Sequence, residues 1–203
     1  MSAADHPWKL IGALVVTAVG SGFLLALVFN WTAPAIEAHR QEAMRRAVLN
    51  VVDQAETFEA VVWVEGAWEV VPLDYNGGTR LCYRGLDSTQ TVVGYAFAAQ
   101  GPGFMDTIKL IYGFNPSSRT VTGMEVLDSR ETPGLGDKIA KDHAFLQSFK
   151  KLSIDPRIIA AAKPSSANEV DAISGATISS EAVVSIVNQD LQWVRDRFEE
   201  PHP

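Results

Sequence analysis

Residues 10–30 form an apolar run, "LIGALVVTAVGSGFLLALVFN", of 21 residues without a charged side chain. A helix of about 20 such residues spans the hydrocarbon core of a bilayer. The alternative is a cleaved signal peptide, whose apolar region is usually ~7–15 residues long and is followed by a small-residue cleavage site. The run here is longer, and it is followed by Trp31, a residue type suited to the membrane interface. The sequence therefore predicts a retained transmembrane helix over residues 10–31, after a short tail of residues 1–9.

The basic residues around this run do not decide its orientation. Lys9 precedes the run, whereas Arg40, Arg45 and Arg46 follow it. Counted literally, the positive-inside rule places the C-terminal side in the cytoplasm. Large domains, however, cross the membrane largely regardless of charge, so the residues alone leave the side open.

The composition excludes several classes of function. A net charge of −7 without a cluster of Lys and Arg argues against binding to nucleic acid. Cys82 is the only cysteine, which rules out an internal disulfide, a thiolate-ligated cluster and a C-x-x-C-H haem attachment; we interpret it as a small buried residue. The four histidines lack metal-ligand or catalytic-triad spacing, so we predict no metal ligands and no catalytic residues. If this chain moves electrons, it needs an organic cofactor.

The segment after the apolar run, residues 32–56, is predicted to be a connecting helix. Pro34 suits the first turn of a helix, and a helix is therefore expected to begin there. A loose apolar stripe at helical spacing follows, formed by Ile36, Met44, Ala47, Val48 and Val51.

The remaining residues, 57–203, are predicted to form a single α+β domain. Strand signals occur at residues 57–72 (two strands around Glu65-Gly66), 80–86, 91–100, 107–114 and 120–129. One helix is expected to open at Asp137 and run to residue 149, and a last helix covers residues 179–198. Strands followed by helices indicate a mostly antiparallel sheet with helices packed against it.

The stretch "DAISGATISS", residues 171–180, allows two interpretations. Ser and Thr are preferred N-caps and Gly relaxes a turn, so the stretch can be a simple entry into the last helix. Alternatively, one hydroxyl is a modification site. Gly175 and Ala176 give Thr177 small neighbours. A phosphate on Thr177 would lie at the start of the helix, where free amides and the helix dipole favour negative charge.

Asp171, Ser174, Gly175, Ala176 and Thr177 resemble the flavinyl-transferase acceptor motif of bacterial FMN-binding domains. In that family the threonine carries FMN through a phosphoester bond, which a separate Mg²⁺-dependent transferase forms from FAD. The resemblance implies covalent FMN on Thr177, with the other four residues as the element that the flavinyl transferase recognises. So many fixed positions make the motif more specific than a single glycine pattern.

A second stretch, "ETPGLG" at residues 131–136, agrees with this resemblance. By itself it is typical of a turn between a strand and a helix. It is similar to the second signature of the same domain, a loop beside the flavin. The resemblance makes six residues candidates for binding FMN: Glu131, Thr132, Pro133, Gly134, Leu135 and Gly136. Glu131 and Thr132 are the candidates for polar contacts to the flavin.

With its single N-terminal span, the whole chain resembles the G subunit of the Rnf electron-transport complex. The related C subunit of the sodium-pumping NADH:quinone reductase shares both motifs, but it is usually longer between anchor and flavin domain, whereas strands here begin near Thr57. The resemblance implies a redox subunit of the bacterial inner membrane, with its flavin domain on the periplasmic side and other Rnf subunits as partners. The resemblance implies a complex that couples electron flow between ferredoxin and NAD to ion movement. The isolated chain is expected to have no substrate pocket of its own.

Three alternatives stay open at this point. The chain can be the quinone-reductase subunit, another anchored flavoprotein, or a membrane-anchored binding or sensor domain without redox function. In the last case the "SGAT" segment, residues 174–177, is only a turn.

Overall fold

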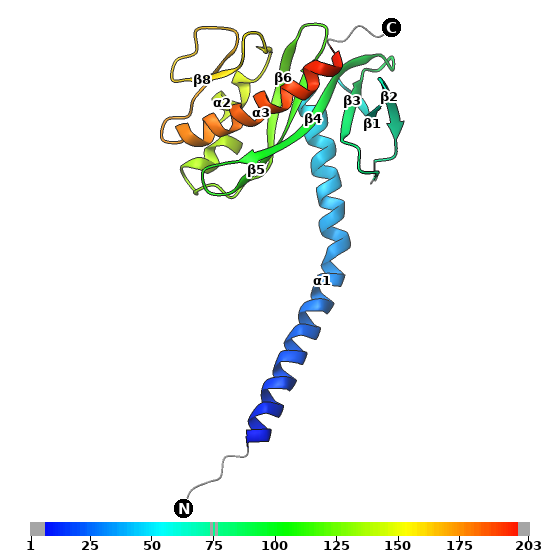
Figure 1. Cartoon of the computed structure of the whole chain (residues 1–203), viewed down its shortest axis with the longest axis vertical. Coiled ribbons are helices and arrows are strands. Elements are labelled where there is room, and N and C mark those ends of the chain that lie inside the picture. The colour runs from blue at the N-terminus through cyan, green and yellow to red at the C-terminus, as the bar shows by residue number, and fades with distance from the viewer. Residues whose placement is uncertain (1–6, 74, 76, 199–203) are drawn as a thin grey trace, which may run out of the picture. The chain divides into compact units, whose positions relative to one another are not determined.

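The computed structural model describes residues 7–73, 75 and 77–198 (Figure 1). These residues form two compact units, which divide between Ala43 and Met44. Most of the N-terminal tail predicted over residues 1–9 lies outside the described residues.

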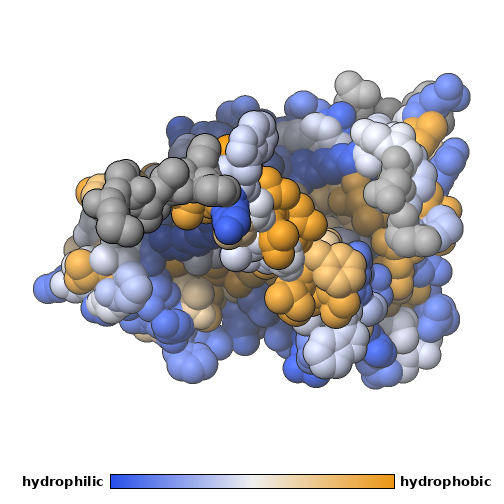
Figure 2. Space-filling view, turned by 90° about the horizontal axis from the view of Figure 1, so that it is seen from below, coloured by the Kyte–Doolittle hydropathy of each residue, from blue (hydrophilic) through white to orange (hydrophobic). Residues whose placement is uncertain are grey.

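Helix α1 (Pro7–Val51) is one continuous helix of 45 residues. In the described part of the chain, its segment Trp8–Val51 is the one helix that is long and apolar enough to cross a membrane. Large apolar side chains such as Phe23 are exposed along it, and exposed hydrophobic surface stands out in orange in Figure 2. The prediction that a helix begins at Pro34 is wrong, because Pro34 lies inside α1. Proline inside a helix removes one backbone hydrogen bond and crowds the carbonyl four residues earlier.

The second unit contains a seven-stranded sheet in the order β2-β1-β3-β4-β5-β6-β7, in which every neighbouring pair is antiparallel. Its strands are β1 (Thr57–Val64), β2 (Ala67–Val71), β3 (Leu81–Leu86), β4 (Val92–Pro102), β5 (Thr107–Asn115), β6 (Thr120–Asp128) and β7 (Leu152–Ser153). Two short strands, β8 (Ile159–Ala161) and β9 (Glu169–Asp171), pair in parallel as a separate small sheet. The predicted α+β class with a mostly antiparallel sheet is confirmed. The short strands β7, β8 and β9 were not anticipated.

The sheet is covered on both faces because successive residues of a strand point to opposite sides. On β4, Phe97 joins a core beneath helix α3 (Thr177–Phe198), whereas its neighbour Ala96 joins a second core. The second core receives the last two turns of α1, through Ala47, Val48 and Val51. Figure 1 shows α3 lying across the sheet. The helix predicted over residues 179–198 is present, and it buries Val184, Val187, Leu191 and Val194.

Two helices differ from the prediction between Leu135 and Phe149. The structure has a 3₁₀ helix η1 (Gly136–Ala140) and a separate helix α2 (His143–Ser148), not one helix opening at Asp137. The Asp142 carboxylate accepts a hydrogen bond from the Phe145 N–H and so caps α2. Because the backbone of Asp142 is extended, it ends the preceding helical segment and starts a new one.

Candidate functional site

The acceptor stretch forms a tight turn that leads from β9 into α3. The Ala176 N–H donates to the Ile173 carbonyl at 2.9 Å, and Gly175 between them has φ +80°. A left-handed φ of this kind suits glycine, which explains the residue type at this position. Helix α3 starts at Thr177 itself, two residues earlier than predicted.

The early start of α3 separates the hydroxyl groups of the stretch into two sets. Ser179 and Ser180 turn inward and are buried, at 3% and 0% exposure. The Ser180 hydroxyl accepts from the Ile173 N–H and donates to the Ala176 carbonyl, so it serves the turn itself. Ser174 and Thr177 are exposed. Thr177 therefore presents an accessible hydroxyl in the first turn of a 22-residue helix.

Thr177 borders a pocket of about 330 Å³ that the two sequence motifs build together. Its lining residues are Phe104, Glu131, Thr132, Leu135, Gly136, Gly175, Ala176, Thr177, Ile178 and Ser179. Segments some forty residues apart in sequence thus meet at one site. Among the predicted residues, Asp171, Ser174, Pro133 and Gly134 do not line this pocket. Phe104, Ile178 and Ser179 line it without having been predicted as binding residues.

Glu131 lies at the centre of this arrangement. Its carboxylate accepts from the Ser179 hydroxyl at 2.7 Å and from the Met105 N–H at 3.0 Å. Burial alone would raise the pKa of Glu131, but these bonds and the nearby Phe104 and Asp106 amides outweigh it and lower the pKa. The carboxyl group is therefore ionised at neutral pH. Glu131 was predicted to contact the flavin, and the structure shows its oxygens bound to protein donors.

The rest of the "ETPGLG" loop is held by Asp137. The Asp137 carboxylate accepts from the Gly134 N–H at 2.7 Å and pairs with Lys141 at 2.6 Å. The hydrogen bond from Lys141 lowers the pKa of Asp137. Gly134 has φ +77°, which the loop needs in order to turn back toward the pocket. This network leaves Leu135 exposed at the rim of the pocket.

The residues around the pocket fit FMN in two respects. The first-turn amides of α3 have no partner within the helix, and the positive end of the helix dipole lies there, which suits a phosphate on or near Thr177. The exposed side chains of Phe104, Leu135 and Ile178 offer apolar surface to a planar ring. Together they match a ligand with an anionic end and an aromatic end.

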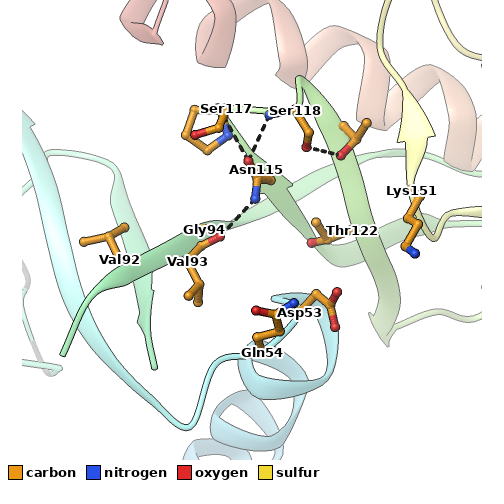
Figure 3. A pocket seen from close by; sticks show the side chains of 12 residues that line it. Asp53, Gln54, Val92, Val93, Gly94, Asn115, Ser117, Ser118, Thr122 and Lys151 are labelled. Carbon is orange, nitrogen blue, oxygen red and sulfur yellow. Dashed lines mark hydrogen bonds between the residues drawn. The ribbon is translucent and has the colours of Figure 1, made fainter. Parts of the chain in front are cut away.

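A larger cavity of about 470 Å³ lies elsewhere in the second unit, and it contains none of the predicted site residues (Figure 3). It is bordered by Asp53, Gln54 and Lys151 and by the β5–β6 turn. Several of its polar side chains bind each other or the backbone. For example, Asn115 accepts from the Ser117 and Ser118 amides and donates to the Val93 carbonyl. Size alone therefore does not make it the functional site.

Other residues with reactive side chains are accounted for by the fold. Cys82 is buried, and this burial raises the pKa of its thiol to about 12, so the thiol stays protonated. Within residues 7–73, 75 and 77–198, no group of three or more His, Cys, Asp or Glu side chains is placed to hold a metal ion.

Comparison with known proteins decides the family. The FMN-binding domain family matches residues 103–192, the segment that contains both motifs and the whole pocket. The G subunit of the ion-translocating oxidoreductase complex of Methanosarcina acetivorans is 32% identical over 96% of this chain and 97% of its own. This chain belongs to the G-subunit family of ion-translocating oxidoreductase complexes. The G subunit of the Na⁺-translocating ferredoxin:NAD⁺ oxidoreductase complex of Acetobacterium woodii is 30% identical over 91% of this chain and 92% of its own.

Solved structures extend the likeness to the fold. NqrC of Shewanella oneidensis superposes with a TM-score of 0.61 at 17% identity, covering 74% of this chain and 91% of that one. The C subunit of the Na⁺-translocating NADH-quinone reductase of Parabacteroides distasonis gives 0.60 at 18% identity, covering 81% and 96%. The second unit of this chain thus has the fold of these C subunits. The predicted resemblance to the Rnf G subunit, with an FMN-binding domain, is confirmed, and attachment of FMN to Thr177 stays a prediction.

Proposed function

We propose that this protein is a membrane-anchored electron-transfer subunit of an Rnf-type ferredoxin:NAD oxidoreductase and carries FMN in a phosphoester bond on Thr177. The relatives from Acetobacterium woodii and Clostridium ljungdahlii are named as subunits of Na⁺-translocating and proton-translocating ferredoxin:NAD⁺ oxidoreductase complexes, respectively. Similarity over most of both chains supports the same assembly for this protein. The quinone-reductase proteins share the fold at low identity, which is weaker support for that alternative.

The observation that carries the proposal is the position of Thr177. Its exposed hydroxyl lies in the first turn of α3 and borders the pocket, whereas Ser179 and Ser180 are buried. In the proposed maturation step, the Thr177 oxygen bonds to the phosphorus of the FMN half of FAD. The pyrophosphate bond breaks, AMP leaves, and the hydroxyl proton passes to the flavinyl transferase. The transferase recognises Ser174, Gly175 and Ala176 in the turn, together with Asp171 at the end of β9.

After attachment, this chain's own residues hold and orient the cofactor. The first-turn amides of α3 would hold the phosphate, and Phe104, Leu135 and Ile178, which line the pocket, would hold the ring. The bound flavin supplies electron-transfer chemistry, and the chain supplies no catalytic residue. Thr132, Pro133, Gly134 and Gly136 shape the loop beside it.

The proposed organisation places the chain in the bacterial inner membrane. Residues 10–31 form the span, the rest of α1 as far as Val51 forms the connecting helix, which is shorter than the predicted 32–56, and residues 57–203 form the FMN-binding domain, on the periplasmic side. The length and hydropathy of α1 support the span. The periplasmic placement of the FMN-binding domain rests on the resemblance alone. Its partners are the other Rnf subunits, which exchange electrons with the flavin.

The attachment is tested by producing the full chain together with a flavinyl transferase in an exporting bacterial host. The wild-type protein should give a fluorescent band after denaturing electrophoresis, and mass spectrometry should place FMN on Thr177. Thr177→Ala should abolish the band, whereas Thr177→Ser keeps a hydroxyl and should retain part of it. A bare Thr177 in the wild-type protein would refute the proposal and favour the sensor interpretation.

Orientation and assembly need separate measurements. A reporter enzyme that is active only outside the cytoplasm, fused after Pro203, should be active in intact cells, and an inactive but stable fusion would contradict the periplasmic placement. Purification of the native complex from its membrane should recover ferredoxin:NAD oxidoreductase subunits, and recovery of quinone-reductase subunits would favour the alternative.

A further inference from the structure

Glu131 is the one charged side chain among the buried residues that the structure describes, with 5% of it exposed. Burying a carboxylate is costly unless hydrogen bonds compensate for the lost water. The compensating donors come from two distant segments, the Met105 N–H in the β4–β5 turn and the Ser179 hydroxyl in α3. They lie 26 and 48 residues from Glu131 in sequence. One carboxylate therefore joins the three segments that enclose the pocket.

Two glycines give this carboxylate its space. A Cβ on Gly103 would lie 2.4 Å from Glu131 Oε1, and a Cβ on Gly136 would lie 2.6 Å from Glu131 Oε2. Both distances are well below any real carbon–oxygen contact, so a side chain at either glycine would displace the carboxylate. The socket is closely shaped around the Glu131 side chain.

The charge of Glu131 is not neutralised by a cation. No Lys, Arg or His among the described residues lies within ion-pair distance of it, whereas its neighbours Asp106 and Asp137 pair with Arg130 and Lys141. Its donors are a neutral hydroxyl and neutral backbone amides. The carboxylate therefore carries a full negative charge at the wall of the pocket.

We propose that Glu131 is a positioning residue of the flavin site that also lowers the reduction potential of the flavin. It holds the β4–β5 turn and the "ETPGLG" loop against the first turn of α3, and its fixed charge disfavours added electrons nearby. This inference rests on the proposed function, because it concerns FMN bound at Thr177.

The direction and the size of the expected change in reduction potential follow from electrostatics. Reduction makes the flavin more negative, and a like charge across a partly water-excluded pocket opposes that change. At an effective dielectric of about 20, removing one unit charge about 10 Å away shifts a one-electron equilibrium on the order of tenfold. A tenfold shift corresponds to about 59 mV for one electron.

Glu131→Gln is the central variant, because it removes the charge and keeps the shape. Its amide oxygen can still accept from the Met105 N–H, and its NH₂ can donate to the Ser179 oxygen once that hydroxyl rotates. We expect enough attached FMN for the titration and a potential raised by about 59 mV, the tenfold shift. Spectroelectrochemical titration of the full chain in neutral detergent measures it.

Glu169→Gln is the matched control. The Glu169 carboxylate also accepts hydrogen bonds from the Ser165 N–H and hydroxyl. Its pKa is also lowered, mainly by the hydrogen bond from the Ser165 N–H. Glu169 does not line the pocket. This variant should leave the flavin potential unchanged.

Ser179→Ala separates charge from structure. It removes one hydrogen bond but leaves the Glu131 charge, now less stabilised, so the potential should stay level or fall. A purely structural role predicts shifts of the same sign in Ser179→Ala and Glu131→Gln, and that result would overturn the electrostatic part.

A readout without flavin tests the positioning part. In the full-length Thr177→Ala chain, adding Glu131→Ala should speed hydrogen exchange of the Met105 amide by tenfold or more, whereas adding Glu131→Gln should not. Equal exchange in both would overturn positioning. If wild-type protein carries FMN and Glu131→Gln does not change its potential, the electrostatic proposal fails. If the wild-type protein carries no FMN, the proposed function fails instead.

Discussion

Gly175 combines a left-handed backbone with open space around it. Its φ is +80°, and an added Cβ would meet only Leu135 Cδ2, at an ordinary 3.9 Å. Gly175→Ala should therefore cost about 1–2 kcal/mol of unfolding free energy through backbone strain alone. Because the strained turn carries Thr177, we also expect reduced FMN loading. Urea unfolding and in-gel flavin fluorescence measure the two effects.

Gly66→Ala serves as the control for this variant. Gly66 has φ +92° and nothing within 4 Å of an added Cβ, but it lies in the β1–β2 turn, away from the pocket. It should lose similar stability and keep full loading. Equal loading in both variants would contradict a specific role for the Gly175 turn.

At the scale of single residues, the sequence singled out Thr177 as the candidate attachment site but did not reveal the functions of its neighbours. Thr177 could be singled out because small residues precede it. The burial of Ser179 and Ser180 was missed, because the helix was expected to begin at Ser179. Extending the apolar stripe one turn toward the N-terminus from Val183 and Val184 would have placed both serines on the buried face. The donors of Glu131 could not be found, because they depend on contacts between distant segments.

The end of α1 packs closely on strand β5. An added Cβ at Gly113 would lie 1.9 Å from the Val51 carbonyl oxygen, and Thr122 Oγ1 donates to that same oxygen. Gly113→Ala should therefore push the last turn of α1 off the sheet and lower the unfolding free energy by about 1–3 kcal/mol, the usual range for overpacking. Thermal unfolding of the second unit in the full chain, followed by tryptophan fluorescence, measures this loss.

Gly123→Ala provides a graded comparison on the neighbouring strand. Its added Cβ would lie 3.2 Å from Val51 Cα, a tight contact that a small shift relieves. Its loss of stability should be smaller than that of Gly113→Ala. The reverse order would show that contact with Val51 does not set the cost.

At the scale of elements, strands were more predictable than helix ends. The strand and turn patterns marked the bounds of β1 to β6 within one or two residues. Pro34 was misleading, because proline suits the first turn of a helix and is disfavoured inside one, yet it lies inside α1. Only two or three residues form each of β7, β8 and β9, which is too few for any hydrophobic period to appear.

For the whole molecule, acid should weaken the fold in a defined window. Hydrogen bonds from Thr89, Lys141 and the Ser165 amide lower the pKa of Asp87, Asp137 and Glu169, respectively. A depressed pKa contributes stability that is complete above the unfolded value, about 3.9–4.3, and is lost as pH falls through the folded value. The unfolding free energy should be flat from about pH 5 to 8 and decline below about pH 4.

Urea unfolding of the full chain in uncharged detergent at a series of pH values checks this. Asp137→Asn should be less stable at pH 7 and show a shallower decline in acid, since one of the groups is gone. Equal stability at pH 3 and pH 7 would contradict the linkage.

The whole-molecule architecture followed from the sequence more securely than its placement in the membrane. One anchor, one α+β domain and the family could be predicted from the apolar run and the two motifs. The division between Ala43 and Met44 could not, because Ile36 and Val48 are equally apolar in the stripe, yet Ile36 is 60% exposed and Val48 fully buried.

Helix α1 belongs to both units, and this affects where the chain can be truncated to obtain a water-soluble FMN-binding domain. Trimming the chain at the end of the hydrophobic run leaves Ala47, Val48 and Val51 in place against the sheet. The sequence alone suggests truncation at the first strand. That truncation would remove the helix residues that cover one face of the sheet and expose an aggregation-prone apolar surface. A water-soluble version therefore has to start no later than residue 43.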